Sequence, residues 1–149
     1  KFIKQLSIDH TWVQEALEKG IITPDQMRDH PNVHVIRRHL GGIRLPEVDF
    51  RLRIDNAEDS EESMNNQGFA LEPGDTILMC TDGLTDLVWD DEMRDIIRNK
   101  RDLKLSAEAL VNLANERGGH DNISVVLLQM PRVEETMPRK GILGWLTGE

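Results

Sequence analysis

One stretch of the chain, residues 74–86, joins an apolar segment to a glycine turn and two carboxylates. Residues 76–81 are apolar enough for a strand, Asp82-Gly83 follows at once, and Asp86 comes four residues after Asp82. Glycine lets the backbone turn away from the strand without Cβ strain. The two carboxylates can then lie on one side of the first turn beyond a stiff strand end. This arrangement suits a hard divalent cation, which binds several rigid oxygen ligands.

A second acidic element, Asp121-Asn122, stands directly before another apolar stretch, residues 123–130. Taken singly, each motif has an ordinary explanation, because Asp-Gly and Asp-Asn are common in turns. Asp86 likewise suits the first turn of a helix, where a negative charge interacts favourably with the helix dipole. The two motifs together, each at one end of a predicted strand, favour a shared metal site over two unrelated turns.

Composition limits the class of protein and its partners. The chain has 149 residues, which fits one domain or a large piece of one, and 27 acidic against 18 basic residues give a net charge of −9. This charge disfavours nucleic acid as a partner. The excess acid is either a solubility feature or in part the surroundings of a metal.

The single cysteine, Cys80, excludes an internal disulfide, and its apolar neighbours predict a buried thiol. The sequence has neither a membrane-spanning run nor a signal-peptide pattern, so a cytoplasmic location is the default expectation.

Apolar residues recur at helical spacing in several segments and alternate with polar residues in one. The alternation at residues 48–54 indicates a half-buried strand. Residues 56–67 are acidic and amide-rich, which predicts a flexible surface loop. Strands combined with paired helices indicate a layered α+β domain. The expected helices are 11–19, a short one from Thr23-Pro24, 90–99 and 106–117, with Thr11, Thr23, Asp90 and Ser106 as their caps.

Several short segments form a wider pattern around the two aspartate motifs. They are residues 6–11, 22–26, 30–31, 35–41, 71–75, 80–86 and 119–124. With this pattern the chain resembles the C-terminal half of a metal-dependent protein phosphatase of the 2C type (the PPM family) in its bacterial form. The resemblance covers residues 2–130. It implies a protein serine/threonine phosphatase, in which metal-activated water hydrolyses phosphoserine and phosphothreonine.

The resemblance also implies a set of site residues. Asp82 and Asp121 match ligands of a catalytic Mn²⁺ or Mg²⁺, and Asp86 matches a position that contributes to a third, weaker metal. A complete domain of this family therefore holds two or three ions. Asn122 matches an orienting residue beside the ligands, and Gly83 belongs to the same motif as Asp82.

The fold and the domain limits follow from the same resemblance. It implies part of a four-layer α-β-β-α sandwich with antiparallel strands over residues 1–130, followed by a polar linker or tail at 131–149. His10 and Arg38 fall in segments that match the flap region of the family. His10 is also explained as an ordinary residue at the start of a helix.

The N-terminal motifs of the family are missing from the chain: a phosphate-binding arginine, a Glu-Asp pair and an Asp-Gly that bridges two metals. We therefore expect a truncated half with little activity alone, whose open strand edge favours a strand-exchanged homodimer. The implied partners are phosphorylated proteins and a cognate serine/threonine kinase. The alternative is a non-catalytic, phosphatase-like binding or regulatory module.

Overall fold

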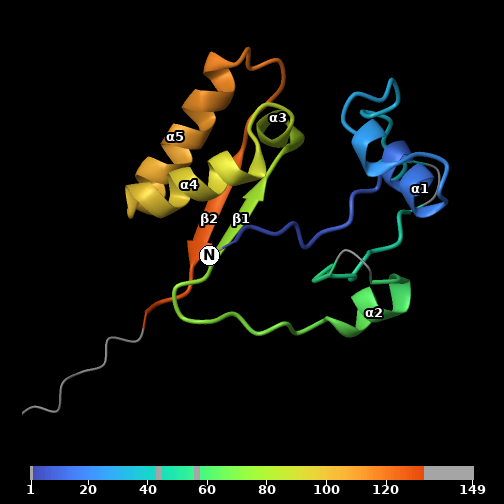
Figure 1. The fold of residues 1–149 in the computed structure, drawn as a ribbon, viewed down its shortest axis with the longest axis horizontal. Helices are drawn as coiled ribbons and strands as arrows, with labels where there is room; N and C mark the ends of the chain where they lie inside the picture. The colour runs from blue at the N-terminus through green and yellow to red at the C-terminus, as the bar shows by residue number, and fades with distance from the viewer. Residues whose placement is uncertain (1, 43–44, 56–57, 133–149) are drawn as a thin grey trace, which may run out of the picture. The chain divides into compact units, whose positions relative to one another are not determined.

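The computed structural model describes residues 2–42, 45–55 and 58–132, and Figure 1 shows their arrangement. The chain divides into two compact units, Lys1–Phe69 and Ala70–Glu149. It contains both helices and antiparallel strands, which confirms the mixed α and β class. Within the described ranges, no helix is long and apolar enough to cross a membrane. Residues 133–149 of the predicted tail lie outside the described residues.

The second unit is built on a two-stranded antiparallel sheet. Strand β1 (Thr76–Cys80) pairs with β2 (Val125–Gln129), and the first residue of β1 lies opposite the last residue of β2. These strands confirm the predictions at 76–81 and 123–130, each trimmed at its ends. Because the strands run in opposite directions, the end of β1 and the start of β2 lie at the same edge of the sheet.

Three helices connect β1 to β2: α3 (Asp82–Thr85), α4 (Asp90–Lys100) and α5 (Leu103–Glu116). Helix α5 packs against β2 and against α4, and both longer helices lie on one side of the sheet in Figure 1. The helices predicted at 90–99 and 106–117 are therefore confirmed, although α5 begins earlier than expected.

The two helix starts differ from the prediction in their capping residues. Helix α4 is preceded by Trp89 as the N-cap, and the Glu92 carboxylate accepts the Trp89 backbone N–H at 3.0 Å. Helix α5 is capped by Asp102, whose Oδ1 accepts the Leu105 N–H at 2.8 Å. Ser106, the predicted cap, is buried inside the first turn and donates its hydroxyl to the Asp102 carbonyl.

The core of the second unit is apolar and forms where the three helices meet. Leu84, Val88, Met93, Leu110 and Ala114 are almost completely buried. Leu84 belongs to the short helix α3, so its burial anchors the turn that begins directly after β1. A fixed α3 in turn gives a defined position to the carboxylate at its first residue.

The sheet also carries exposed apolar side chains. Met79 and Val126 are paired across the strands and are each 49% exposed, and Leu128 is 54% exposed. Cys80, the last residue of β1, is exposed as well, so the prediction of a buried thiol was wrong. An apolar run signals a strand, but a strand end in a two-stranded sheet has few neighbours to cover it.

The first unit contains α1 (Trp12–Glu18) and a single 3₁₀ turn at Pro24–Gln26. Thr11 caps α1 by accepting the Gln14 N–H at 3.2 Å, as predicted. The Gln26 side chain accepts the Thr23 N–H at 2.9 Å, which closes the short turn. The segment after this turn returns to α1, since Trp12 N–H donates to the Val35 carbonyl at 2.8 Å.

Two predictions for the first unit were wrong. Residues 48–53 carry no strand pairing in the part of the chain that the structure describes, although Arg53 N–H donates to the Leu6 carbonyl at 2.8 Å. The segment predicted as a loop contains α2 (Ser60–Asn65). Asp59 caps this helix by accepting amides of its first turn, while Glu62 accepts the Asp59 N–H at 3.0 Å. This reciprocal capping stabilises a helix that apolar periodicity does not signal.

Candidate metal centre

The two predicted metal-binding motifs lie at the same edge of the sheet. Asp82 is the first residue of α3, directly beyond the end of β1, and Asp86 follows the last residue of that helix. Asp121 lies in the loop that leads into β2. Asp82, Asp86 and Asp121 are all exposed. The antiparallel pairing of β1 with β2 therefore brings together two aspartate motifs that are far apart in sequence.

The backbones of the two motifs are in contact. A Cβ atom at Gly83 would lie 2.6 Å from the Asn122 carbonyl oxygen and 3.4 Å from the Asp121 carbonyl carbon. Real Cβ atoms do not approach a backbone oxygen so closely, so only glycine fits at this position. Glycine is required here for close approach between two loops rather than for a left-handed turn.

Each of the two aspartates is held by the amide of the residue that follows it. Gly83 N–H donates to Asp82 Oδ1 at 3.0 Å, and Asn122 N–H donates to Asp121 Oδ1 at 2.6 Å. Asp86 N–H donates to the Asp82 carbonyl at 2.8 Å, which closes the turn of α3. The amides of Gly83 and Asn122, both named from the sequence, thus orient the carboxylates of their neighbours.

Thr81 joins the two motifs by side-chain hydrogen bonds that sequence reasoning missed. Its hydroxyl donates to the Asn122 carbonyl at 2.8 Å and accepts the Ser124 N–H at 3.0 Å. Its backbone N–H donates to the Ser124 carbonyl at 3.1 Å. A threonine before Asp-Gly is visible in the sequence, but its partners are known only once β1 and β2 are paired.

The donor set of the described residues is incomplete as a metal site. Asp82 and Asp121 offer carboxylate oxygens, which is the ligand chemistry of Mg²⁺ and Mn²⁺. No group of three or more His, Cys, Asp or Glu side chains that could hold a metal ion is formed within residues 2–42, 45–55 and 58–132. The oxygen ligands that the chain offers therefore suit a hard cation, but they form only part of the ligand set that such an ion needs.

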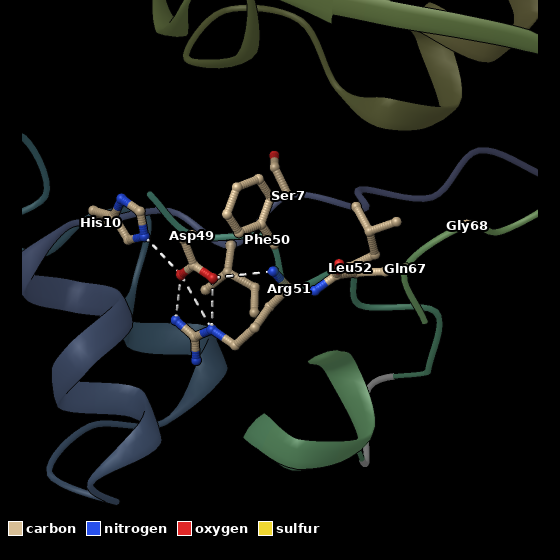
Figure 2. A pocket seen from close by; sticks show the side chains of 9 residues that line it. Ser7, His10, Asp49, Phe50, Arg51, Leu52, Gln67 and Gly68 are labelled. Carbon is tan, nitrogen blue, oxygen red and sulfur yellow. Dashed lines mark hydrogen bonds and ion pairs between the residues drawn. The ribbon is translucent and has the colours of Figure 1, made fainter. Parts of the chain in front are cut away.

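The predicted flap residues belong to the first unit. Arg38 donates from Nη1 to the Glu47 carbonyl at 3.1 Å. His10 lies 2.8 Å from Asp49, measured from Nε2 to Oδ2, and Asp49 also accepts Arg51 Nη2 at 2.6 Å and Nε at 2.9 Å. Figure 2 shows the His10 and Arg51 side chains converging on the carboxylate between them.

This cluster lines a cavity of about 510 Å³ in the first unit, together with Phe50 and Leu52. The Asp49 side chain is only 11% exposed. Hydrogen bonds from Arg51, followed by the one from His10, hold the pKa of the Asp49 carboxyl well below its usual value. The sequence placed Asp49 and Arg51 on the polar side of a strand and did not indicate that His10 contacts them.

Comparison with known proteins points to the class of protein that the sequence motifs resemble. Residues 29–131 match the family described as Stage II sporulation protein E (SpoIIE). The serine/threonine phosphatase stp of Listeria welshimeri is 33% identical over 139 residues, which covers 93% of this chain and 47% of that protein. The chain therefore spans about half the length of the curated relative that it matches.

Solved structures agree with this match. The serine/threonine phosphatase PstP/Ppp of Mycobacterium tuberculosis is 31% identical with a TM-score of 0.66, covering 87% of this chain and 47% of that one. The catalytic domain of PstP in complex with two manganese ions is 25% identical with a TM-score of 0.50, covering 83% and 44%. Together these similarities define the class of metal-dependent protein phosphatases. The chain belongs to the bacterial 2C-type (PPM) protein phosphatase family.

Proposed function

We propose that this chain provides one side of the metal centre of a protein serine/threonine phosphatase, with Asp82 and Asp121 as metal ligands. The observation that carries the proposal is the contact between the motifs, in which the Gly83 backbone lies against Asn122. A similar protein, PstP, has been solved with two manganese ions, which supports Mn²⁺ as the cation, with Mg²⁺ as the alternative. Asp86, one turn after Asp82, is assigned to a third and weaker ion.

The residues of this chain act by fixing oxygen ligands. The Gly83 and Asn122 amides hold Asp82 and Asp121 in one orientation each, so little side-chain freedom is lost when an ion binds. Bound divalent ions in such a centre supply an activated water for attack on phosphorus and neutralise the developing charge. The exposure of Asp82 and Asp121 gives a phosphorylated side chain access to this edge of the sheet.

The wider setting is proposed on the same basis. The two-stranded sheet with helices on one side is assigned to half of a four-layer α-β-β-α sandwich, and residues 1–130 to the phosphatase portion with 131–149 as a tail. Phosphorylated proteins are the proposed substrates, with a cognate serine/threonine kinase as a functional partner. A free, exposed thiol at Cys80 suits a reducing compartment and so supports a cytoplasmic location.

The chain by itself is proposed to have little phosphatase activity, because its described residues form no group of three metal-binding side chains. The test compares the chain with a chimera in which it is joined to the part of the Listeria welshimeri phosphatase outside the match. Activity is measured on p-nitrophenyl phosphate and on a phosphothreonine peptide with Mn²⁺. We expect turnover by the chimera and little by the chain alone.

Substitutions in the chimera then assign the residues. Asp82→Asn and Asp121→Asn should each lower kcat/KM by more than about 100-fold, the upper value for loss of an orienting partner of a metal ligand. Asp91→Asn, an exposed carboxylate of α4, serves as the matched control and should leave activity unchanged. A chimera that binds Mn²⁺ normally but hydrolyses neither substrate would favour the non-catalytic binding module.

A further inference from the structure

The hydroxyl of Thr81 connects two backbone groups of the opposite motif. It donates to the Asn122 carbonyl and accepts the Ser124 N–H, so one side chain bonds on both sides of Ile123. The regular pairing of the strands ends one residue earlier, at Cys80 opposite Val125. Beyond that pair, the Thr81 backbone N–H adds one further bond, to the Ser124 carbonyl.

We propose that Thr81 is a positioning residue for the metal centre: its hydroxyl holds the Asp121 loop in place against the Asp82 turn. The inference rests on the proposed function of these two aspartates. The chain turns into α3 immediately after Thr81, so the backbone beyond the Thr81 N–H cannot continue the sheet ladder. The Thr81 side chain bonds the Asn122 carbonyl and the Ser124 amide instead. It thus extends the hydrogen bonding between the two segments toward Asp82 and Asp121.

The Asn122 carbonyl is the critical contact in this arrangement. It lies against the Gly83 backbone on one side and accepts the Thr81 hydroxyl, while the Asn122 N–H orients Asp121 Oδ1. A shift of Asn122 would therefore move Asp121 relative to Asp82. Partners that orient metal ligands in this way affect metal affinity without touching the ion.

The opposite end of β1 offers a matched control. Thr76 also uses its hydroxyl across the strand pair, where it accepts the Gln129 side-chain amide at 3.0 Å. Both threonines adjoin the same pair of strands, but the Thr76 bond reaches only a side chain and is remote from both aspartates. Thr76→Val and Thr81→Val therefore remove a similar hydroxyl at the two ends of one sheet.

The test measures Mn²⁺ binding by the same chimera, in which the full 149-residue chain is joined to the rest of the Listeria welshimeri phosphatase, with free Mn²⁺ followed by electron paramagnetic resonance. Thr81→Val should weaken Mn²⁺ binding by about 10- to 100-fold. Thr81→Ser keeps the hydroxyl and should bind Mn²⁺ with the affinity of the parent. Thr76→Val should also leave the Mn²⁺ affinity unchanged. Amide hydrogen exchange at Ser124 should also become faster in Thr81→Val. Thr81→Ala, which adds no methyl group in place of the hydroxyl, replaces Thr81→Val if that variant does not fold.

The outcomes separate the inference from the function on which it rests. If Thr81→Val binds Mn²⁺ as Thr76→Val does, or if Thr81→Ser is as weak as Thr81→Val, the positioning role is overturned while the metal site stands. If instead Asp82→Asn and Asp121→Asn leave Mn²⁺ binding by the chimera unchanged, the proposed metal site fails and the inference fails with it.

Discussion

Gly83 lies directly against Asn122: a Cβ atom at position 83 would stand 2.6 Å from the Asn122 carbonyl oxygen. The obstructing atom belongs to the backbone, so it cannot rotate away as the end of a side chain could. Gly83 is also a helical residue of α3, where alanine is normally preferred by about 1 kcal/mol. The contact and the helix propensity therefore act in opposite directions at this residue.

Gly83→Ala should lower the free energy of unfolding by about 1–3 kcal/mol, the usual effect of overpacking, despite the better helix propensity of alanine. The measurement is urea denaturation followed by circular dichroism. Thr85→Ala in the same short helix is the control: it also introduces alanine into α3, but it removes a 3.4 Å bond from the Thr85 hydroxyl to the Asp82 carbonyl and creates no clash with Asn122. An alanine variant at position 83 that is as stable as the parent would show that the two loops can separate freely.

The pH dependence of the second unit should follow Glu92. Arg117 binds both carboxylate oxygens of Glu92, at 2.6 and 2.7 Å, and hydrogen bonds from Arg117 and then from the Trp89 amide lower the Glu92 pKa from 4.5 to about 2. Because the folded pKa is depressed, the stabilisation is present above pH 4.5 and is lost as the pH falls toward 2.

The Glu92→Gln variant should therefore have a lower Tm than the parent chain at pH 6. The difference in Tm should shrink as the pH is lowered from 4.5 toward 2. Thermal unfolding at a series of pH values measures it. Asp91→Asn, which removes an adjacent carboxylate of the same helical turn, is the control. A Tm difference that stays constant down to pH 2 would contradict the assignment of the shift to Glu92.

Asp49 should stabilise the first unit through its two basic partners. Its carboxylate is 11% exposed and binds His10 and Arg51, so its loss leaves a largely buried guanidinium without its charged partner. Asp49→Asn should lower the free energy of unfolding by about 1.5–3 kcal/mol, the range for hydrogen bonds to charged groups. Asp25→Asn, an exposed acid of the short 3₁₀ turn, should have little effect. If the two variants are equally stable in urea denaturation, the contacts of Asp49 with His10 and Arg51 do not stabilise the first unit.

These residues also show which parts of the fold a sequence reveals. The strand before Asp82 and the helices after it carry strong local signals, namely an apolar run, an Asp-Gly turn and helical spacing. The start of α5 was misplaced because Asp102 and Ser106 are both good caps, and only packing decides between them. The alternation around Asp49 resembled a strand, but a strand also needs a partner that local sequence does not identify.

The site was predicted unevenly for a related reason. Asp82 and Asp121 are motif residues, so their types and their order along the chain are evident from the sequence alone. The bonds of Thr81 to the opposite motif depend on a pairing register between distant segments, which is set by the whole sheet. The contact of His10 with Asp49 depends in the same way on the path of the chain between them.

The exposed apolar side chains of the sheet should cause the isolated chain to self-associate. Met79, Val126 and Leu128 are each about half exposed and lie on two adjacent strands, so they form a continuous patch rather than scattered single residues. Leu128→Gln should shift sedimentation toward the monomer at concentrations where the parent chain forms larger species. Leu105→Gln is the matched control, because Leu105 is 52% exposed against 54% for Leu128 but lies on α5, away from the patch. If both substitutions change sedimentation equally, general hydrophobicity and not this face of the sheet drives association; if neither does, the expected homodimer does not form through this face.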